Sequence, residues 1–289
     1  MSIVVAGSST RACVERALGS HLRSFAEWPY PYATSHPLIA FDAELEDGRT
    51  VAGLVKEPGS SHGSEPACGR RSVRERAVYE LVSAVAVAPR LLGAAAGRLV
   101  LERLEGDVLW QRGDVESWCA AAHTARVLHD GLRASVGENV LLRYDRAFYE
   151  HWLHRARSLA GPLLPVERVH AAAAERLLAE PQVVIHGELY PSNVVVAAGR
   201  AFFVDWETAG AGPAVVDLAA LTSGLPEHHA GAAIAAYGAV DPVALDCARL
   251  HLSLRWLGWA AGWQPPREHV RDWRREAFAV AGRLEESLG

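Results

Sequence analysis

The sequence contains a single lysine, Lys56, and its other basic residues are arginines. It has only four cysteines, and none of them forms a Cys-x-x-Cys pair, so neither a zinc knuckle nor a disulfide framework is expected. No run of lysine and arginine marks a basic patch, which argues against a nucleic-acid partner. No apolar stretch reaches the roughly 18 residues that a membrane helix needs, so no membrane partner is expected.

The overall composition is that of an ordinary globular protein. Of the 289 residues, 50% are hydrophobic and 22% are charged, and the net charge is −5. The first residues have no basic segment before their short apolar run, so no secretory signal is expected. We therefore expect a cytoplasmic protein.

The lone lysine is a candidate functional residue. The richness in arginine and alanine is typical of a GC-rich genome, in which lysine codons drift away. A lysine that persists under such a bias can mark a position that arginine cannot fill, because lysine is a compact point charge on a flexible stem. Chance survival is the alternative.

The first part of the chain is predicted to be rich in β-structure. Alternating residues over 38–56, with an Asp-Gly pair between them, predict two strands joined by a turn. The Gly-, Ser- and Pro-rich segment 57–71 predicts a loop. Ser72 and Glu75 have the spacing of a capping box, which predicts a helix from about Ser72. A short strand is predicted at 99–101.

The second part is predicted to be largely helical with an embedded hairpin. Its predicted elements are helices at 116–132 and 167–179, a strand at 183–185, a hairpin over 194–204 that turns at Gly199, and helices after Asp217. We place the boundary after the strand that ends the first part. This gives an N-terminal domain at 1–101 and a C-terminal domain at 102–289.

The strongest chemical signal lies between the predicted strand and the hairpin. The sequence His-Gly-Glu-Leu-Tyr-Pro-Ser-Asn spans 186–193, and Asp-Trp-Glu follows at 205–207. This arrangement can bring a carboxylate, an amide and a second carboxylate to one edge lined by loops. Such oxygen donors suit Mg²⁺. Phosphoryl transfer needs metal ligands, a residue that orients the attacking hydroxyl, and a cation on the phosphates.

These segments resemble the aminoglycoside phosphotransferase family. Its members carry a His-Gly-Asp loop with Asn five residues after the Asp, and a second Asp at the end of a hairpin, often as Asp-Trp-Glu. The match runs from Val183 to Leu221, and weaker likeness extends to Leu-Val-Leu-Glu-Arg-Leu-Glu-Gly at 99–106 and His-Thr-Ala-Arg-Val-Leu-His at 123–129. The resemblance implies an α+β, two-lobed protein-kinase-like fold. Its N-lobe would hold a five-stranded antiparallel sheet and one helix, its C-lobe would be largely helical, and a nucleotide would bind in the cleft.

The resemblance also implies roles for individual residues of the loop and hairpin. Asn193 and Asp205 would be the Mg²⁺ ligands, and Glu188 would be the catalytic base. Asp217 and His186 would support the loop structurally.

In the N-terminal domain the resemblance implies a nucleotide site for ATP or GTP. Lys56 would contact the phosphates and pair with Glu75, although Glu75 could instead serve only the capping box. Glu102 and Leu104 would belong to the segment that lines the purine pocket. No Gly-x-Gly-x-x-Gly is present, and Ser35 is our candidate for a phosphate-binding loop, with a plain turn as the alternative.

The sequence departs from the family at the catalytic position, where Glu188 replaces the usual Asp. The added methylene moves the carboxylate outward by roughly 1–1.5 Å, and misplacements near 1 Å can cost about 10²-fold in rate. Because both metal ligands and the lysine are present, we favour an active enzyme. The alternative is a nucleotide-binding pseudokinase without catalysis.

The acceptor is expected to be a small molecule, with an antibiotic favoured over a metabolite such as homoserine, choline or a sugar. Leu252, Trp256, Trp259 and Trp263 lie near one face of a predicted helix, as core residues or as an aromatic wall of the acceptor pocket. Residues 209–289 contain nine Asp/Glu against seven Arg, which is no strong acidic cluster. This favours a nucleoside, macrolide or other weakly cationic antibiotic over a polycationic aminoglycoside. The sequence leaves the oligomeric state open.

Overall fold

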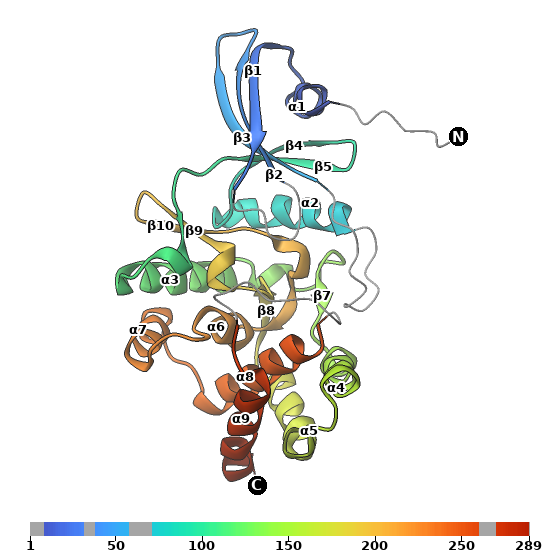
Figure 1. The fold of residues 1–289 in the computed structure, drawn as a ribbon, viewed down its shortest axis with the longest axis vertical. Helices are drawn as coiled ribbons and strands as arrows, with labels where there is room; N and C mark the ends of the chain where they lie inside the picture. The colour runs from blue at the N-terminus through green and yellow to red at the C-terminus, as the bar shows by residue number, and fades with distance from the viewer. Residues whose placement is uncertain (1–8, 32–37, 58–70, 260–269, 289) are drawn as a thin grey trace, which may run out of the picture. The chain divides into compact units, whose positions relative to one another are not determined.

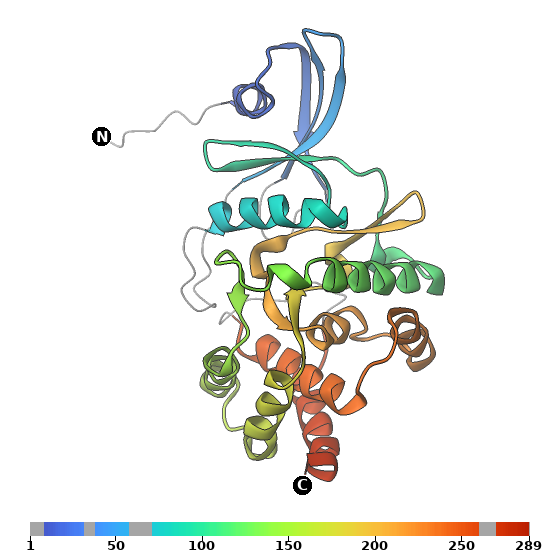
Figure 2. The ribbon, with the colours of Figure 1, turned by 180° about the vertical axis from the view of Figure 1, so that it is seen from behind.

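The computed structural model describes residues 9–31, 38–57, 71–259 and 270–288. The predicted phosphate-loop residue Ser35 and the aromatic residue Trp263 lie outside these residues. The chain divides into two compact units, with the break between Glu105 and Gly106. Figures 1 and 2 show the elements of each unit from opposite sides.

The first unit is built on a five-stranded antiparallel sheet in the order β1-β2-β3-β5-β4, as the resemblance implied. Its strands are β1 Leu22–Pro29, β2 Leu38–Leu45, β3 Thr50–Lys56, β4 Leu91–Ala95 and β5 Arg98–Glu102. The predicted hairpin is formed by β2 and β3, which pair from Leu38 opposite Lys56 to Glu44 opposite Thr50. Gly48 in its turn has φ 86°, a conformation that glycine adopts at little cost.

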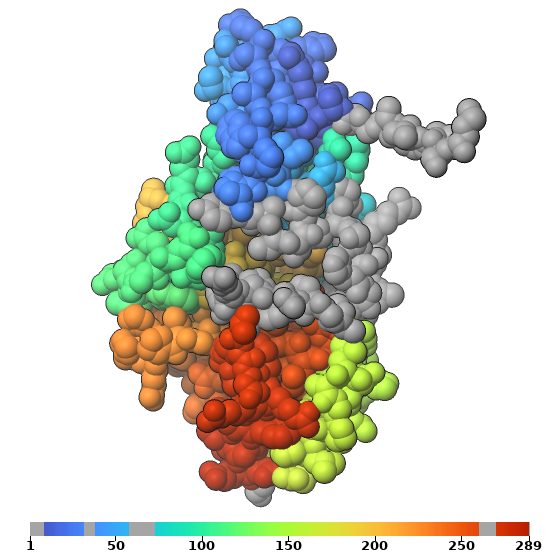
Figure 3. Space-filling model, viewed as in Figure 1, coloured from blue at the N-terminus to red at the C-terminus, as the bar shows by residue number. Residues whose placement is uncertain are grey.

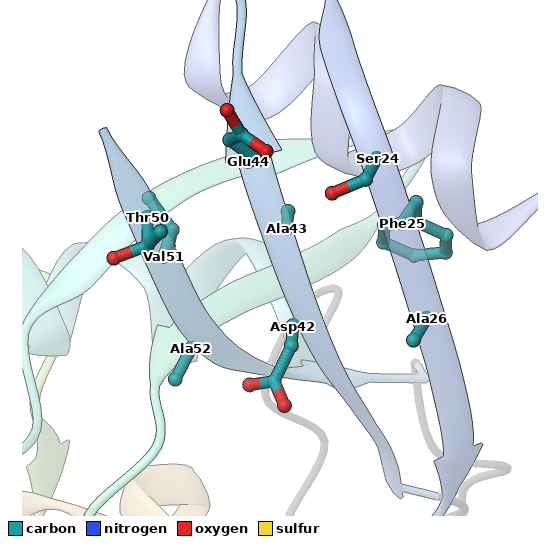
Figure 4. Close-up of a pocket in the computed structure, with 9 residues that line it drawn as sticks. All are labelled: Ser24, Phe25, Ala26, Asp42, Ala43, Glu44, Thr50, Val51 and Ala52. Carbon is teal, nitrogen blue, oxygen red and sulfur yellow. The ribbon is translucent and has the colours of Figure 1, made fainter. Parts of the chain in front are cut away.

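The two faces of this sheet differ because side chains alternate along each strand. On one face Phe41, Val55 and Val100 form a core with Cys13 and Val14 of helix α1 (Thr10–Leu18). The opposite face of β1–β3 carries both polar and apolar side chains, and Asp42 and Thr50 on it are exposed. A shallow pocket there is lined by residues that include Ser24, Asp42, Glu44 and Thr50, and Figure 4 shows these side chains on their strands.

A second helix of the first unit, α2 (Arg71–Val82), packs against β4 and β5. It begins one residue before the predicted start at Ser72. Its buried residues include Val78, Tyr79 and Val82. A single 3₁₀ turn, η1 (Ser83–Val85), ends it. The predicted strand at 99–101 is the centre of β5.

The second unit is mainly helical and contains two three-stranded sheets, ordered β10-β9-β6 and β7-β11-β8. Its helices are α3 Val115–Gly131, α4 Arg146–Ala160, α5 Leu164–Leu178, α6 Val215–Leu221, α7 Glu227–Tyr237, α8 Pro242–Leu257 and α9 Trp273–Leu288. Its strands are β6 Asp107–Val108, β7 Leu142–Arg143, β8 Gln182–Ile185, β9 Val194–Ala197, β10 Arg200–Phe203 and β11 Gly210–Pro213. Four short 3₁₀ turns complete it: η2 Leu109–Gln111, η3 Arg133–Ser135, η4 Pro191–Asn193 and η5 Trp206–Thr208.

The sequence predicted α3 and α5 to within a few residues at each end but missed α4. The starts of α3 and α4 follow local capping rules, because Asp114 accepts a hydrogen bond from Ser117 N–H and Asp145 accepts one from Phe148 N–H. The predicted hairpin is β9–β10, and the two residues of its tight turn, Ala198 and Gly199, both have positive φ.

Helix α8 lies at the centre of the helical part of this unit. It contacts α4, α5, α6 and α9. Figure 3 shows the red atoms of α9 beside the yellow-green atoms of α4 and α5. Because α8 is covered on several sides, most of its side chains are buried, including that of Arg255 near its end. None of the described helices is long and apolar enough to span a bilayer.

Candidate active site

The loop that follows β8 is forced close to two neighbouring segments. Gly187 has φ 83°, and a Cβ at this position would collide with the Tyr144 hydroxyl and the Thr208 carbonyl oxygen. A larger residue would therefore be excluded both by its backbone conformation and by its volume. This explains the glycine of the His-Gly-Glu sequence in physical terms.

Asp217 of α6 binds the backbone of this loop. Its carboxylate is fully buried and accepts hydrogen bonds from the N–H groups of His186 and Gly187, each at 2.8 Å. His186 also accepts the Glu188 N–H at Nδ1 (3.3 Å), so its Nε2 carries the proton that is donated to the Val204 carbonyl oxygen (2.9 Å). Asp217 and His186 thus make the structural contacts that the resemblance implied.

A chain of buried hydrogen bonds connects Asp217 to helices α3 and α7. His129 of α3 lies 3.0 Å from Asp217 through Nε2 and 3.0 Å from the Tyr237 hydroxyl of α7 through Nδ1. Burial raises the pKa of Tyr237 to about 12, so its hydroxyl keeps a proton and can donate it to Nδ1. His129 Nε2–H then donates to the carboxylate, which only accepts. The loop is therefore tied to α3, α6 and α7.

Glu188, the predicted catalytic base, is held by a residue that the sequence did not identify. Its side chain is 17% exposed, and its Oε1 accepts a hydrogen bond of 2.7 Å from Arg255 Nη2. Arg255 lies 67 positions further along the chain, on α8. The only sequence signal was an arginine within the apolar run Leu-Ser-Leu-Arg-Trp-Leu.

The two predicted metal ligands are brought together by the backbone. Val204 N–H donates to the Asn193 carbonyl oxygen at 2.9 Å, which sets Asp205 beside Asn193. Asn193 Nδ2 donates to the Glu188 carbonyl oxygen at 2.9 Å, so the amide oxygen is the atom turned to other partners. Asp205 has φ 67°, a left-handed conformation that Asp tolerates better than most residues.

This arrangement fits Mg²⁺ only as a site with few protein ligands. Over the described ranges, no group of three or more His, Cys, Asp or Glu side chains could hold a metal ion. Asn193 and Asp205 supply one amide oxygen and one carboxylate. Mg²⁺ commonly binds one or two carboxylates and completes its octahedron with water and substrate phosphates. The residues present therefore suit a Mg²⁺ ion that arrives with a nucleotide.

In the first unit, Lys56 and Glu75 form the predicted ion pair. Lys56 Nζ and Glu75 Oε1 are 2.7 Å apart, and the two side chains are 8% and 4% exposed. Glu75 therefore has a structural partner beyond the helix start that its spacing from Ser72 suggested. A buried pair of this kind fixes the position of the lysine ammonium group, because separating the two charges in the interior would be costly.

The predicted purine-binding residues lie at and just after the end of β5. The Glu102 carboxylate accepts hydrogen bonds from Arg90 Nε and Nη2 at 3.1 and 3.2 Å, so this side chain is engaged on the surface of the first unit. Leu104 is half-buried in the segment that follows. A role for either residue in nucleotide binding would fall to its backbone, and it stays a prediction.

The predicted aromatic face divides into two separate stacks. Trp256 stacks on Trp273 with ring centroids 5.1 Å apart, and it also contacts Tyr190 of the loop at 5.1 Å. Trp259 stacks instead on Trp152 at 5.9 Å. Leu252 is buried with the first stack, so it is a core residue. The half-buried Trp256 lies against the segment that carries Glu188.

Comparisons with known proteins agree with this geometry. The model of the phosphotransferase enzyme family matches residues 69–251. No curated protein matches the chain in sequence. Many solved structures are similar to the chain, including the three that follow. A protein from Thermobifida fusca YX-ER1, assigned as a fructosamine-3-kinase, has 18% identity and a TM-score of 0.64, with 96% of this chain and 99% of that chain covered.

The second is the choline kinase LicA from Streptococcus pneumoniae, with 16% identity and a TM-score of 0.63 over 92% of this chain and 94% of that one. LicA has also been solved in complex with AMP. The third is the macrolide 2′-phosphotransferase MphH from Brachybacterium faecium, with 18% identity and a TM-score of 0.57 over 83% and 86%. These likenesses confirm the predicted α+β, two-lobed protein-kinase-like fold.

Proposed function

Because this chain belongs to the phosphotransferase enzyme family, we propose that it moves the γ-phosphoryl group of ATP or GTP to a hydroxyl group of a small molecule with the help of Mg²⁺. The observation that carries the proposal is the loop over 186–193. A buried carboxylate fixes its backbone, and the Asn193 amide donates to the carbonyl oxygen of Glu188, which ties these two residues of the loop together.

In this proposal each polar residue has one task. Glu188 accepts the proton of the attacking hydroxyl and orients its oxygen toward the phosphorus. Asn193 and Asp205 bind the Mg²⁺ ion, which would neutralise charge on the phosphates. Lys56, positioned by Glu75, contacts the nucleotide phosphates. Such a division suits phosphoryl transfer, because its loose transition state asks mainly for positioning and charge stabilisation.

An antibiotic of weak positive charge is the acceptor we favour, which would give the protein a role in resistance or self-protection. The carboxylates of the C-terminal helices support this, because several are already neutralised. Asp241, Asp246, Glu276 and Glu285 each form an ion pair with an arginine. A polycationic aminoglycoside would instead call for clustered carboxylates without such partners. Trp256, which stacks on the buried Trp273 beside Tyr190, is half-buried, and its exposed part would supply apolar surface for a ring system.

A metabolic small-molecule kinase is the second candidate function. The solved structures that are similar include a choline kinase and a protein assigned as a fructosamine-3-kinase, so the same fold serves metabolic acceptors. The third candidate, a nucleotide-binding pseudokinase, is motivated by Glu188 in place of Asp.

The proposal is tested by nucleotide turnover with a panel of acceptors. We expect Mg²⁺-dependent transfer from ATP or GTP to a macrolide or nucleoside antibiotic, and growth protection of a sensitive host. Transfer to choline, homoserine or a sugar, without protection, would favour the metabolic kinase. Nucleotide binding without turnover on any acceptor would favour the pseudokinase. Better turnover with CTP or UTP than with either purine nucleotide would contradict the proposed donor.

A further inference from the structure

Arg255 is a buried charge placed behind the catalytic loop. Its side chain is 2% exposed, and arginine is almost never so fully buried unless it is paired. Its guanidinium donates through Nη2 to Glu188 Oε1 and through Nη1 to the carbonyl oxygen of Gly187. One rigid group thus binds both the side chain of Glu188 and the backbone of the residue before it.

Trp152 and His251 lie near the guanidinium of Arg255. Its Cζ lies 5.4 Å from the ring centroid of Trp152, as in a cation–π contact. His251 precedes it by one turn on α8 and is fully buried. Burial, reinforced by the Arg255 charge, lowers the pKa of His251 well below its ordinary value, so the imidazole is neutral. Glu188 is a negative partner of the guanidinium, at 2.7 Å.

We propose that Arg255 is a positioning residue that fixes the Glu188 carboxylate for catalysis and thereby allows glutamate to stand where the family usually has aspartate. This inference rests on the proposed function. A glutamate side chain has one more rotatable bond than an aspartate side chain, so without a restraint its carboxylate would sample several positions. The arginine fork removes that freedom by tying the carboxylate to the backbone of its own loop.

The reach of the two side chains makes the pairing specific to glutamate. Removing one methylene would withdraw the carboxylate by roughly 1–1.5 Å and lengthen the 2.7 Å contact to about 4 Å, beyond hydrogen-bond distance. Lysine at position 255 would keep the charge, but it would lose the fork that contacts the carboxylate and the Gly187 carbonyl together. Both partners are therefore needed in their present form.

The test is a double-mutant cycle on hydrolysis of MgATP, with water as the acceptor, and on any acceptor that the panel identifies. We expect Arg255→Gln to lower kcat by about 30-fold or more while KM for MgATP changes less than about threefold, because only the base is displaced. Arg255→Lys should lie between this variant and the wild type. In a Glu188→Gln background, Arg255→Gln should cause almost no further loss. Arg249→Gln, on the same helix but paired with Asp246, is the matched control and should keep the wild-type kcat.

Two kinetic results would overturn the inference. One is wild-type kcat in Arg255→Gln, and the other is an equal fold-loss from Arg255→Gln in the wild-type background and in the Glu188→Gln background. If circular dichroism shows that Arg255→Gln is unfolded, Arg255→Lys replaces it in the comparison with the wild type. Urea unfolding of the wild type, the two single variants and the double variant measures the coupling between Arg255 and Glu188 without catalysis. If the midpoint shifts of the two single variants simply added up in the double variant, the inference would also be overturned. Absence of turnover in the wild type would defeat the proposed function separately, while urea unfolding would still report on the pair.

Discussion

Asp217 is the residue whose loss should most disturb the catalytic loop. Replacing it by alanine removes an acceptor from three buried donors: the N–H groups of His186 and Gly187, at 2.8 Å each, and His129 Nε2 at 3.0 Å. No water can readily replace the carboxylate, because Asp217 and its surroundings are fully buried. The loop that carries Glu188 would lose its attachment to α3 and α6.

The expected cost can be worked out from these contacts. Each buried donor left unsatisfied costs about 1–3 kcal/mol, so Asp217→Ala should destabilise the protein by about 3–6 kcal/mol after partial relaxation. A typical domain has about 5–15 kcal/mol in total, so the variant should lie near the edge of folding. Asp217→Asn keeps one acceptor oxygen but turns an NH₂ group toward a donor, and it should lose about 2–4 kcal/mol.

The assay is urea unfolding followed by tryptophan fluorescence, with Trp206 as a buried reporter in the same unit. Asp130→Ala is the control, because it removes an aspartate of α3 whose ion pairs with Arg126 and Arg133 lie on the surface. That variant should lose less than about 1 kcal/mol. If Asp217→Ala were as stable as Asp130→Ala and retained activity, Asp217 would not hold the loop and the reasoning from buried donors would be refuted.

Three further results are expected. Lys56→Ala should lower kcat/KM for the nucleotide at least about tenfold, or ~1.4 kcal/mol, and normal steady-state turnover would show that Lys56 does not bind the phosphates. Asp205→Ala should abolish Mg²⁺-dependent phosphorylation with an unchanged circular dichroism spectrum, whereas activity that survives chelation with EDTA would contradict the metal site. The pKa of His251 is lowered in the folded protein, so the unfolded state binds the proton more strongly. The contribution of the neutral imidazole to stability is therefore complete above about pH 6.5 and is lost as the pH falls below that value. The urea midpoint should therefore decrease more between pH 7.5 and pH 5.5 in the wild type than in His251→Phe. An equal decrease in the two proteins would argue against a neutral buried His251.

The parts of the site that could be predicted are those that depend on neighbours in sequence. The hairpin with its turn at Gly199 follows from alternation and turn chemistry, and Asn193 and Asp205 flank that hairpin, so their proximity follows from its register. The five-stranded sheet and the pairing of Lys56 with Glu75 came instead from the resemblance, because 19 residues separate the two partners. Local physics alone could not have joined them.

The parts that could not be predicted depend on tertiary packing between distant helices. Tyr237 forms a hydrogen bond with His129, although 108 positions separate them in the sequence. Neither residue belongs to a sequence pattern that would predict this contact. Helix α4 was missed although its buried residues Phe148, Tyr149, Trp152 and Ala156 follow helical spacing, so its apolar face could have been found from the sequence. Trp152 among them lies against the guanidinium of Arg255.

The contact between Glu188 and Arg255 changes how the departure at the catalytic position should be interpreted. Judged from the loop alone, a longer side chain is a misplacement, and misplacement by about 1 Å is costly. In the folded chain the position of the carboxylate is set by two anchors, the loop backbone and a buried guanidinium on α8. A glutamate bound at both ends has little more freedom than an aspartate bound at one. Because removing Glu188 would take a charged partner from a guanidinium that is only 2% exposed, the pair contributes to stability as well as to geometry. Under the proposed positioning by Arg255, the longer side chain at this position is no argument against an active phosphotransferase.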